Sequence, residues 1–117
     1  MGERGENEYS VQLYRAVSQE ELDDIALFNG FRPGSGCMET KLFVTSVADA
    51  AFFAREILYP LDNKPLTIVE VTIPHASGNR LFHLTTDGKP VVAVDLEQLR
   101  KFNALSRRQV MQTSPIP

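Results

Sequence analysis

The sequence predicts an α+β domain in which a mixed or antiparallel sheet is split around a cleft, with three short helices beside it. Three helix starts support this prediction, because the oxygen-bearing cap residues Ser18, Ser46 and Asp95 each follow an extended segment. Short segments rich in β-branched residues separate the helices. A chain of 117 residues, 43% of them hydrophobic, is long enough for one domain with one core.

We expect a single domain over residues 10–106. Residues 1–9 are polar and mostly acidic, and they predict a disordered tail without the apolar core of a secretory signal. Residues 107–117, which contain Pro115 and Pro117, predict a flexible C-terminal tail. The expected location is the cytoplasm, or delivery by a secretion system as part of a larger effector.

Composition limits the expected partners. No apolar run approaches the roughly 20 residues that span a bilayer, so we expect no membrane span. The net charge of -3 gives no broad attraction to phosphate backbones, which argues against a nucleic-acid partner. Cys37 is the single cysteine, and His75 and His83 have no third ligand at metal spacing, so we expect no metal site.

The spacing of apolar residues, together with the residues that begin or end helices and strands, predicts the order of the secondary-structure elements. Apolar residues at helical spacing follow each cap residue and predict helices that bury one face. Runs of β-branched residues predict the strands, and Asp87 with Gly88 predicts a tight turn between the last two. In order, the expected elements are a strand over 13–17, a helix over 19–29 ended by Gly30, a loop over 32–40, a strand over 42–45, a helix from 47 limited by Pro60, strands over 66–73, 80–84 and 91–94, and a helix from 96 to about 106.

Three segments share a pattern with a known superfamily. Residues 13–18 (LYRAVS), 43–54 (FVTSVADAAFFA) and 68–74 (IVEVTIP) follow one another as strand, strand end with helix, and strand. In this order they resemble the ADP-ribosyltransferase-like superfamily, especially its small bacterial toxin domains and its rifampin-modifying branch. The resemblance covers about 11–103 and implies a split-sheet fold in which Arg15 holds the ribose and phosphate of NAD.

The resemblance also implies NAD as substrate, without a metal. Cleavage of the nicotinamide bond develops positive charge on the ribose, which a carboxylate stabilises. Catalytic members of the superfamily carry that acid on a late strand, which falls here near 89–92, where no acid is present. The nearby acids are Glu70, Asp87, Asp95 and Glu97. The expected catalytic residues are Arg15, Ser46 and Glu70, and the expected NAD contacts are Tyr14, Arg15, Ala16, Phe43, Thr45, Ser46 and Phe53.

Each of these residues also has a structural interpretation. Ser46 predicts a helix cap on its own, and Arg15 could be a solvent-facing or ion-paired arginine. Glu70 lies in an apolar strand, where it needs a partner or a sheet edge because an unpaired buried carboxylate is costly. Phe52 and Phe53 suit core packing.

Three functions remain open. The first is NAD-dependent ADP-ribosyl transfer or NAD hydrolysis by a bacterial toxin or effector domain, with an unidentified ADP-ribose acceptor or protein partner and an immunity protein. The missing late-strand acid favours the second, a catalytically inactive fold relative that binds a nucleotide or a protein. The third is a small metal-free ribonuclease toxin that uses His75 or His83 as acid and base, against which the net charge argues.

Overall fold

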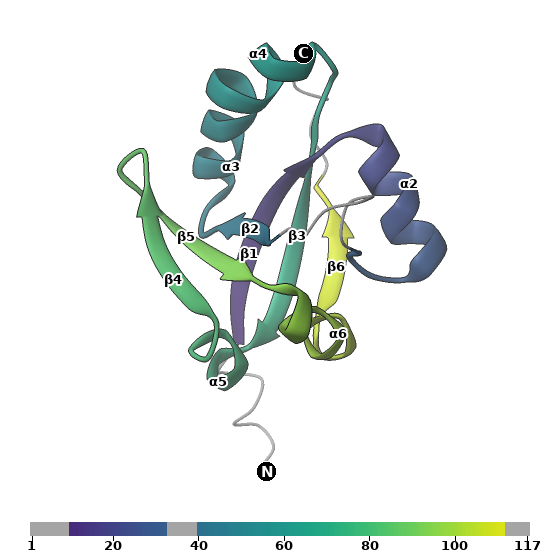
Figure 1. Cartoon of the computed structure of the whole chain (residues 1–117), viewed down its shortest axis with the longest axis vertical. Coiled ribbons are helices and arrows are strands. Elements are labelled where there is room, and N and C mark those ends of the chain that lie inside the picture. Colours follow the sequence, from purple (N-terminus) through teal and green to yellow (C-terminus); the bar gives the residue numbers. More distant parts are fainter. Residues whose placement is uncertain (1–9, 33–39, 112–117) are drawn as a thin grey trace.

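The computed structural model describes residues 10–32 and 40–111 (Figure 1). The expected N-terminal tail, the loop residue Cys37 and the last residues of the expected C-terminal tail lie outside this part of the chain. The described residues form an α+β fold with a six-stranded sheet and several helices, which agrees with the predicted fold class at that level.

Each neighbouring pair of strands in the sheet is antiparallel, so the sheet is antiparallel rather than mixed. The strand order is β4-β5-β2-β1-β3-β6. β1 pairs with β3 along eight residues, and this pair forms the centre of one half of the sheet. The strands are β1 (Ser10–Val17), β2 (Lys41–Val44), β3 (Thr67–Pro74), β4 (Phe82–Thr86), β5 (Lys89–Val94) and β6 (Arg107–Val110).

The three predicted helix starts are confirmed. Ser18 and Ser46 each accept a hydrogen bond from the backbone amide three residues further on, at 3.2 and 3.1 Å. Asp95 and Gln98 form a complete capping box, in which each side chain bonds the backbone amide of the other residue. The helices are α2 (Gln19–Phe28), α3 (Val47–Phe53), the π-helical turn η1 (Ala54–Leu58), α4 (Tyr59–Asp62), α5 (His75–Gly78) and α6 (Leu96–Leu105).

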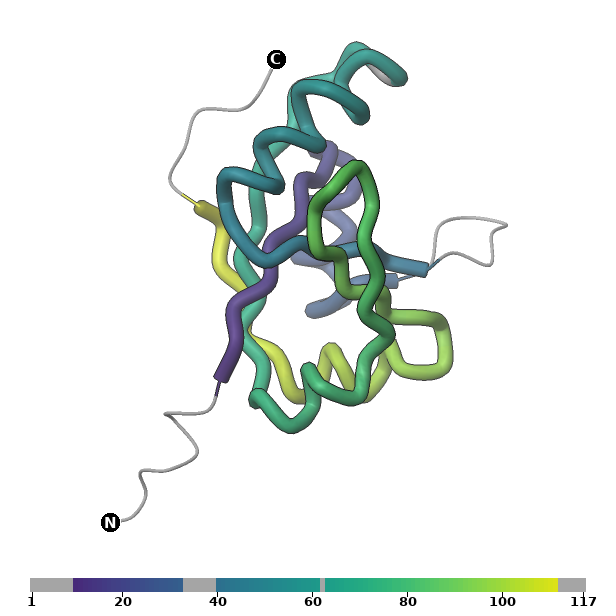
Figure 2. Tube along the Cα trace, turned by 90° about the vertical axis from the view of Figure 1, so that its left-hand side faces the viewer, coloured from purple at the N-terminus to yellow at the C-terminus, as the bar shows by residue number. Residues whose placement is uncertain are grey.

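Helices cover both faces of the sheet. In Figure 1, α2 lies on one side of β1 and α3 on the other. Figure 2 shows β1, β3 and β6 side by side, with the β4–β5 hairpin standing apart from them. The sheet thus has two parts that diverge from one another, and this divergence positions the candidate site.

The larger core contains three aromatic rings. Phe31, Phe43 and Phe102 are buried, and their ring centroids lie 5.2, 6.2 and 5.1 Å apart. Their edge-to-face and tilted arrangements are those that aromatic pairs prefer. A smaller cluster on the other face holds Val44, Ala50, Ile68 and Val91.

The helical run that begins after Ser46 ends at Asp62, two residues beyond Pro60, as expected from the limit that this proline sets. A π-helical turn precedes α4, and Pro60 occupies the first turn of α4. Proline is tolerated in a first helical turn, where its missing N–H costs little. Asn63, with a φ of 57°, then ends the helix in the left-handed conformation.

The prediction of a flexible tail that starts at residue 107 is wrong for its first residues. Residues 107–110 form β6 at the edge of the sheet. β6 pairs with β3 over four residues, from Arg107 to Val110. Arg108 donates to both the backbone and the side-chain oxygen of Asn29, at 2.9 and 2.7 Å. Partial burial lowers the pKa of the Arg108 guanidinium. The long-range pairing therefore orders a segment that has no apolar pattern of its own.

The sequence led us to expect that Gly30 ends α2. The residue that ends α2 in the left-handed conformation is Asn29, with a φ of 57°, rather than Gly30. Gly30 is instead required by close approach, since a Cβ atom there would lie 2.6 Å from the side chain of Asn103. Asn103 accepts a hydrogen bond from the Phe31 amide and donates one to the Phe31 carbonyl, both at 2.8 Å.

The hairpin between β4 and β5 has the predicted tight turn. Asp87 and Gly88 both have positive φ, at 52° and 76°, as a two-residue type I′ turn requires. β4 begins at Phe82 rather than near residue 80, because α5 and the turn that follows it occupy the preceding residues. No local signal in the sequence predicted α5.

Candidate functional site

The pairing within the sheet is shortest between β1 and β2. These strands pair in register at Tyr14 and Val44, whereas β2 pairs with β5 along all four of its residues. The half β4-β5-β2 and the half β1-β3-β6 therefore contact each other over a short stretch of backbone. Beyond this pair no further register partners join β1 to β2, and the Arg15 side chain bonds the Leu42 carbonyl there.

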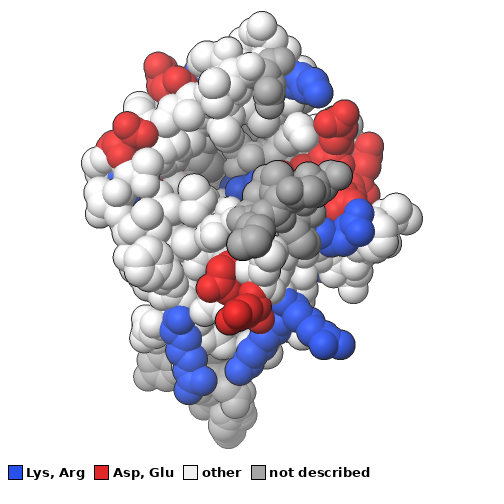
Figure 3. All heavy atoms as spheres, viewed as in Figure 1, with Lys and Arg blue, Asp and Glu red and all other residues white. Residues whose placement is uncertain are grey.

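A cavity of about 250 Å³, here called the split-sheet cavity, opens at this short pairing. Tyr14, Arg15, Ala16 and Phe53 line it, so it contains four of the expected NAD contacts. Figure 3 shows a hollow near the middle of one face of the molecule, with basic atoms at its base. Small-molecule pockets are typically about 300–1,000 Å³, so the cavity suits a ring with a sugar better than a whole dinucleotide.

Arg15 is held firmly at the edge of this cavity. Its Nε and Nη2 donate to the two carboxylate oxygens of Glu21, at 2.7 and 3.1 Å, which makes a bidentate ion pair between β1 and α2. Its Nη1 donates to the backbone carbonyl of Leu42 in β2, at 3.0 Å. Lys41 lies 3.8 Å from the same Glu21 carboxylate. The guanidinium therefore bridges the two halves of the sheet where their backbones separate.

Glu70 does not line the split-sheet cavity, and its catalytic role stays a prediction. The sheet order places β3 on the far side of β1 from β2, and β1 therefore separates Glu70 from the divergence. Glu70 faces Tyr14 in the β1–β3 register and accepts a hydrogen bond from its hydroxyl at 3.1 Å. This bond provides the partner that a carboxylate in an apolar strand requires.

Tyr14 should titrate above its ordinary pKa of 10.0, because burial raises that pKa and the hydrogen bond and negative charge of Glu70 raise it further. The folded state then holds the phenolic proton more tightly than the unfolded chain. This contributes stability below the ordinary pKa, which is lost as the pH rises above it. We expect Glu70→Gln to lower the pKa of Tyr14, measured by NMR titration of its ring, while Glu97→Gln leaves it unchanged. Equal values in both variants would contradict the Tyr14–Glu70 contact.

Ser46 and Thr45 also lie outside the lining of the split-sheet cavity. Antiparallel strands run in opposite directions, so from the Tyr14↔Val44 pair Arg15 and Ser46 lie on opposite sides, about 10 Å apart along the strands at roughly 3.3 Å per residue. The Ser46 hydroxyl caps α3. Thr45 lines a different cavity, together with His75 and His83.

Phe43 cannot stack on a ligand, since its ring is fully buried in the aromatic core. It projects from β2 toward the face covered by α2 and α6, while its neighbours Leu42 and Val44 line the cavity on the other face. Phe53, the last residue of α3, lines the cavity. Phe52 does not line the cavity; its ring packs edge-on against that of Phe53, with centroids 5.5 Å apart, and the Lys89 ammonium lies 4.8 Å from its centroid.

Asp87 is the acid that lines the split-sheet cavity. The sequence places it among the acids near residues 89–92 but not among the expected site residues. The Asp87–Gly88 turn was recognised, yet the sequence did not show that the hairpin tip folds back toward β1. The twist and pairing of β4 and β5 bring it there.

His75 and His83 line one cavity of about 360 Å³. The His83 Nε2 lies 3.0 Å from the Gly78 carbonyl, so this nitrogen carries the proton and donates. Among the described residues, no group of three or more side chains is arranged to hold a metal ion. Within the same part of the chain, no helix is long and apolar enough to cross a membrane.

Comparisons with protein-family models, with curated proteins and with solved structures found no match to this chain. The functional argument therefore depends on the residues and geometry described above.

Proposed function

We propose that this domain binds NAD through the nicotinamide and its ribose, which enter the split-sheet cavity while the phosphates face solvent. The observation that carries the proposal is that Arg15, which bridges β1 and β2, lines the same cavity as two aromatic side chains, Tyr14 and Phe53. Aromatic walls suit a flat ring, and a cavity of about 250 Å³ suits one half of a dinucleotide. The resemblance to the ADP-ribosyltransferase-like superfamily supports the same ligand.

Arg15 is preorganised in this proposal. Three of its N–H groups bond Glu21 and Leu42, and an arginine has five, so two remain to donate to a ribose hydroxyl or a phosphate oxygen. The bidentate contact with Glu21 fixes the plane of the guanidinium, which reduces the entropy lost when a ligand binds. The Glu21 carboxylate also offsets part of the positive charge of Arg15. Arg15 is therefore better suited to bind the nucleoside half of NAD than its phosphates.

A second candidate function is ADP-ribosyl transfer or NAD hydrolysis, in the manner of a toxin or effector domain. The position of Asp87 on the cavity wall favours it, because a carboxylate beside the ribose would stabilise the positive charge that develops as nicotinamide leaves. The acceptor would then be water or a group on an unidentified partner. Without turnover, the domain would be a binding relative of such enzymes.

Phe53→Ala and Phe52→Ala are a matched pair for testing the binding proposal. Both remove a ring from the end of α3, but only Phe53 lines the cavity. Calorimetric titration of the chain with NAD should show saturable binding that Phe53→Ala weakens about tenfold, from the loss of stacking and apolar contact. Phe52→Ala should change the dissociation constant by less than about twofold. Absence of saturable NAD binding, or equal losses in the two variants, would reject the proposal.

The Asp87→Asn variant distinguishes NAD binding from cleavage of NAD. Asparagine tolerates the left-handed turn conformation, and Asn-Gly is a favoured hairpin turn, so the fold should be retained. If the chain releases nicotinamide from NAD, this variant should abolish release while NAD still binds. If Asp87→Asn still releases nicotinamide, Asp87 is not the catalytic acid. If the unmodified chain releases no nicotinamide, NAD binding alone is the function.

A further inference from the structure

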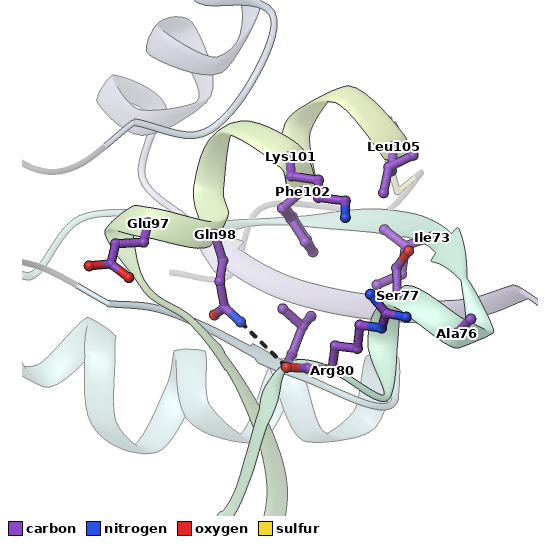
Figure 4. A pocket seen from close by; sticks show the side chains of 10 residues that line it. Ile73, Ala76, Ser77, Arg80, Glu97, Gln98, Lys101, Phe102 and Leu105 are labelled. Atoms are coloured by element: carbon purple, nitrogen blue, oxygen red, sulfur yellow. Dashed lines mark hydrogen bonds between the residues drawn. The ribbon is translucent and has the colours of Figure 1, made fainter.

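A second cavity, of about 430 Å³, lies between α6 and the segment that contains α5 (Figure 4). Its lining differs completely from that of the split-sheet cavity. Ile73, Leu81, Phe102 and Leu105 provide an apolar floor. The volume lies within the roughly 300–1,000 Å³ of typical small-molecule pockets.

Two basic side chains, Arg80 and Lys101, also line this cavity. Neither the guanidinium nor the ammonium forms a hydrogen bond or an ion pair with another residue of the described chain. In Figure 4 the Arg80 side chain comes from the segment after α5 and the Lys101 side chain from α6. An anion bound between them would displace no existing ion pair.

Glu97 is the acidic residue of the lining, and Figure 4 shows its carboxylate pointing away from Arg80 and Lys101. Gln98 donates to the Arg80 carbonyl at 3.4 Å, which ties α6 to the segment that carries Arg80. The cavity therefore has a positive side above an apolar floor, with one negative charge at its edge. That edge charge opposes a dianion more strongly than a monoanion, which favours a carboxylate over a phosphate ester.

We propose that this cavity binds an amphipathic monocarboxylate. Its hydrocarbon chain would pack on Phe102, Leu105 and their apolar neighbours, and its carboxylate would lie between Arg80 and Lys101. Arginine offers a carboxylate two parallel N–H groups, and lysine adds a point charge beside them. This inference is independent of NAD binding because the two cavities share no lining residue.

Octanoate is the probe for this proposal, titrated into the full chain and followed by amide NMR shifts. We expect saturable binding with shifts at Phe102 and Leu105. Octanol has the chain without the charge and acetate has the charge without the chain, so each should bind at least about tenfold more weakly. Arg80→Gln and Lys101→Gln should each weaken octanoate binding about fivefold to tenfold, from the loss of a charged hydrogen bond at an exposed position.

Arg55→Gln is the matched control, because Arg55 is an exposed arginine of η1 outside this cavity. It should leave the octanoate affinity within about twofold. The proposal is overturned if octanol binds as tightly as octanoate, if Arg55→Gln weakens binding as much as Arg80→Gln, or if octanoate does not saturate. Thermal unfolding of each variant checks that the substitutions leave the fold intact.

Discussion

Phe43→Ala is expected to destabilise the domain by about 3–5 kcal/mol, the range seen when a buried phenylalanine is truncated in a packed core. Phe43 is fully buried and its ring contacts those of Phe31 and Phe102. Removing it takes away apolar burial and leaves a cavity that the neighbouring rings cannot fill by small movements. The free energy of unfolding, from chemical denaturation, measures the effect.

Phe82→Ala is the control for this prediction. Phe82 lies in β4 with 66% of its surface exposed, so its truncation should cost less than about 1 kcal/mol. Equal losses for Phe43→Ala and Phe82→Ala would contradict the aromatic core. NAD affinity of the folded fraction should be unchanged by Phe43→Ala, since the ring does not line the split-sheet cavity. A selective loss of NAD affinity would instead restore Phe43 as a ligand contact.

Asn103→Ala is expected to destabilise the domain by about 2–3 kcal/mol, because it removes two hydrogen bonds and leaves the polar backbone groups of a buried residue unpaired. Asn103 bonds both the amide and the carbonyl of Phe31 at 2.8 Å. Those bonds join α6 to the chain that leaves α2, across a sequence separation of 72 residues. Denaturation and hydrogen exchange at the Phe31 amide measure the loss.

Asn79→Ala is the matched control, since Asn79 is an exposed asparagine whose backbone, rather than its side chain, forms the hydrogen bond that ends α5. We expect a change within about 0.5 kcal/mol. Exchange of the Phe31 amide should accelerate in Asn103→Ala and stay constant in Asn79→Ala. Unchanged exchange in Asn103→Ala would mean that the Phe31 amide has another acceptor.

Local signals predicted the elements that depend on a few neighbouring residues. Ser18, Ser46 and Asp95 were correctly placed as helix caps because a cap is a bond between a side chain and an amide three residues away. The Asp87–Gly88 turn was predicted for the same reason, as both residues suit positive φ. Neither inference required knowledge of distant parts of the chain.

Elements that depend on distant partners were missed or misplaced. β6 has a polar sequence, and its order comes from pairing with the edge of β3. Gly30 was interpreted as a helix stop, although its role is to make room for Asn103, far away in the sequence. The π-helical turn before Pro60 was also missed, because apolar periodicity does not reveal one.

The same distinction holds for the candidate site. The sequence by itself determined which side chains lie at the ends of strands and starts of helices, and it identified Tyr14, Arg15, Ala16 and Phe53 among the residues that now share a cavity. Only the tertiary structure decided which of the other candidate residues line the same cavity. Antiparallel register separates Ser46 from Arg15, the strand order puts Glu70 behind β1, and the hairpin brings Asp87 to the cavity wall. Register and strand order arise from long-range backbone pairing, which the local pattern of side chains does not specify.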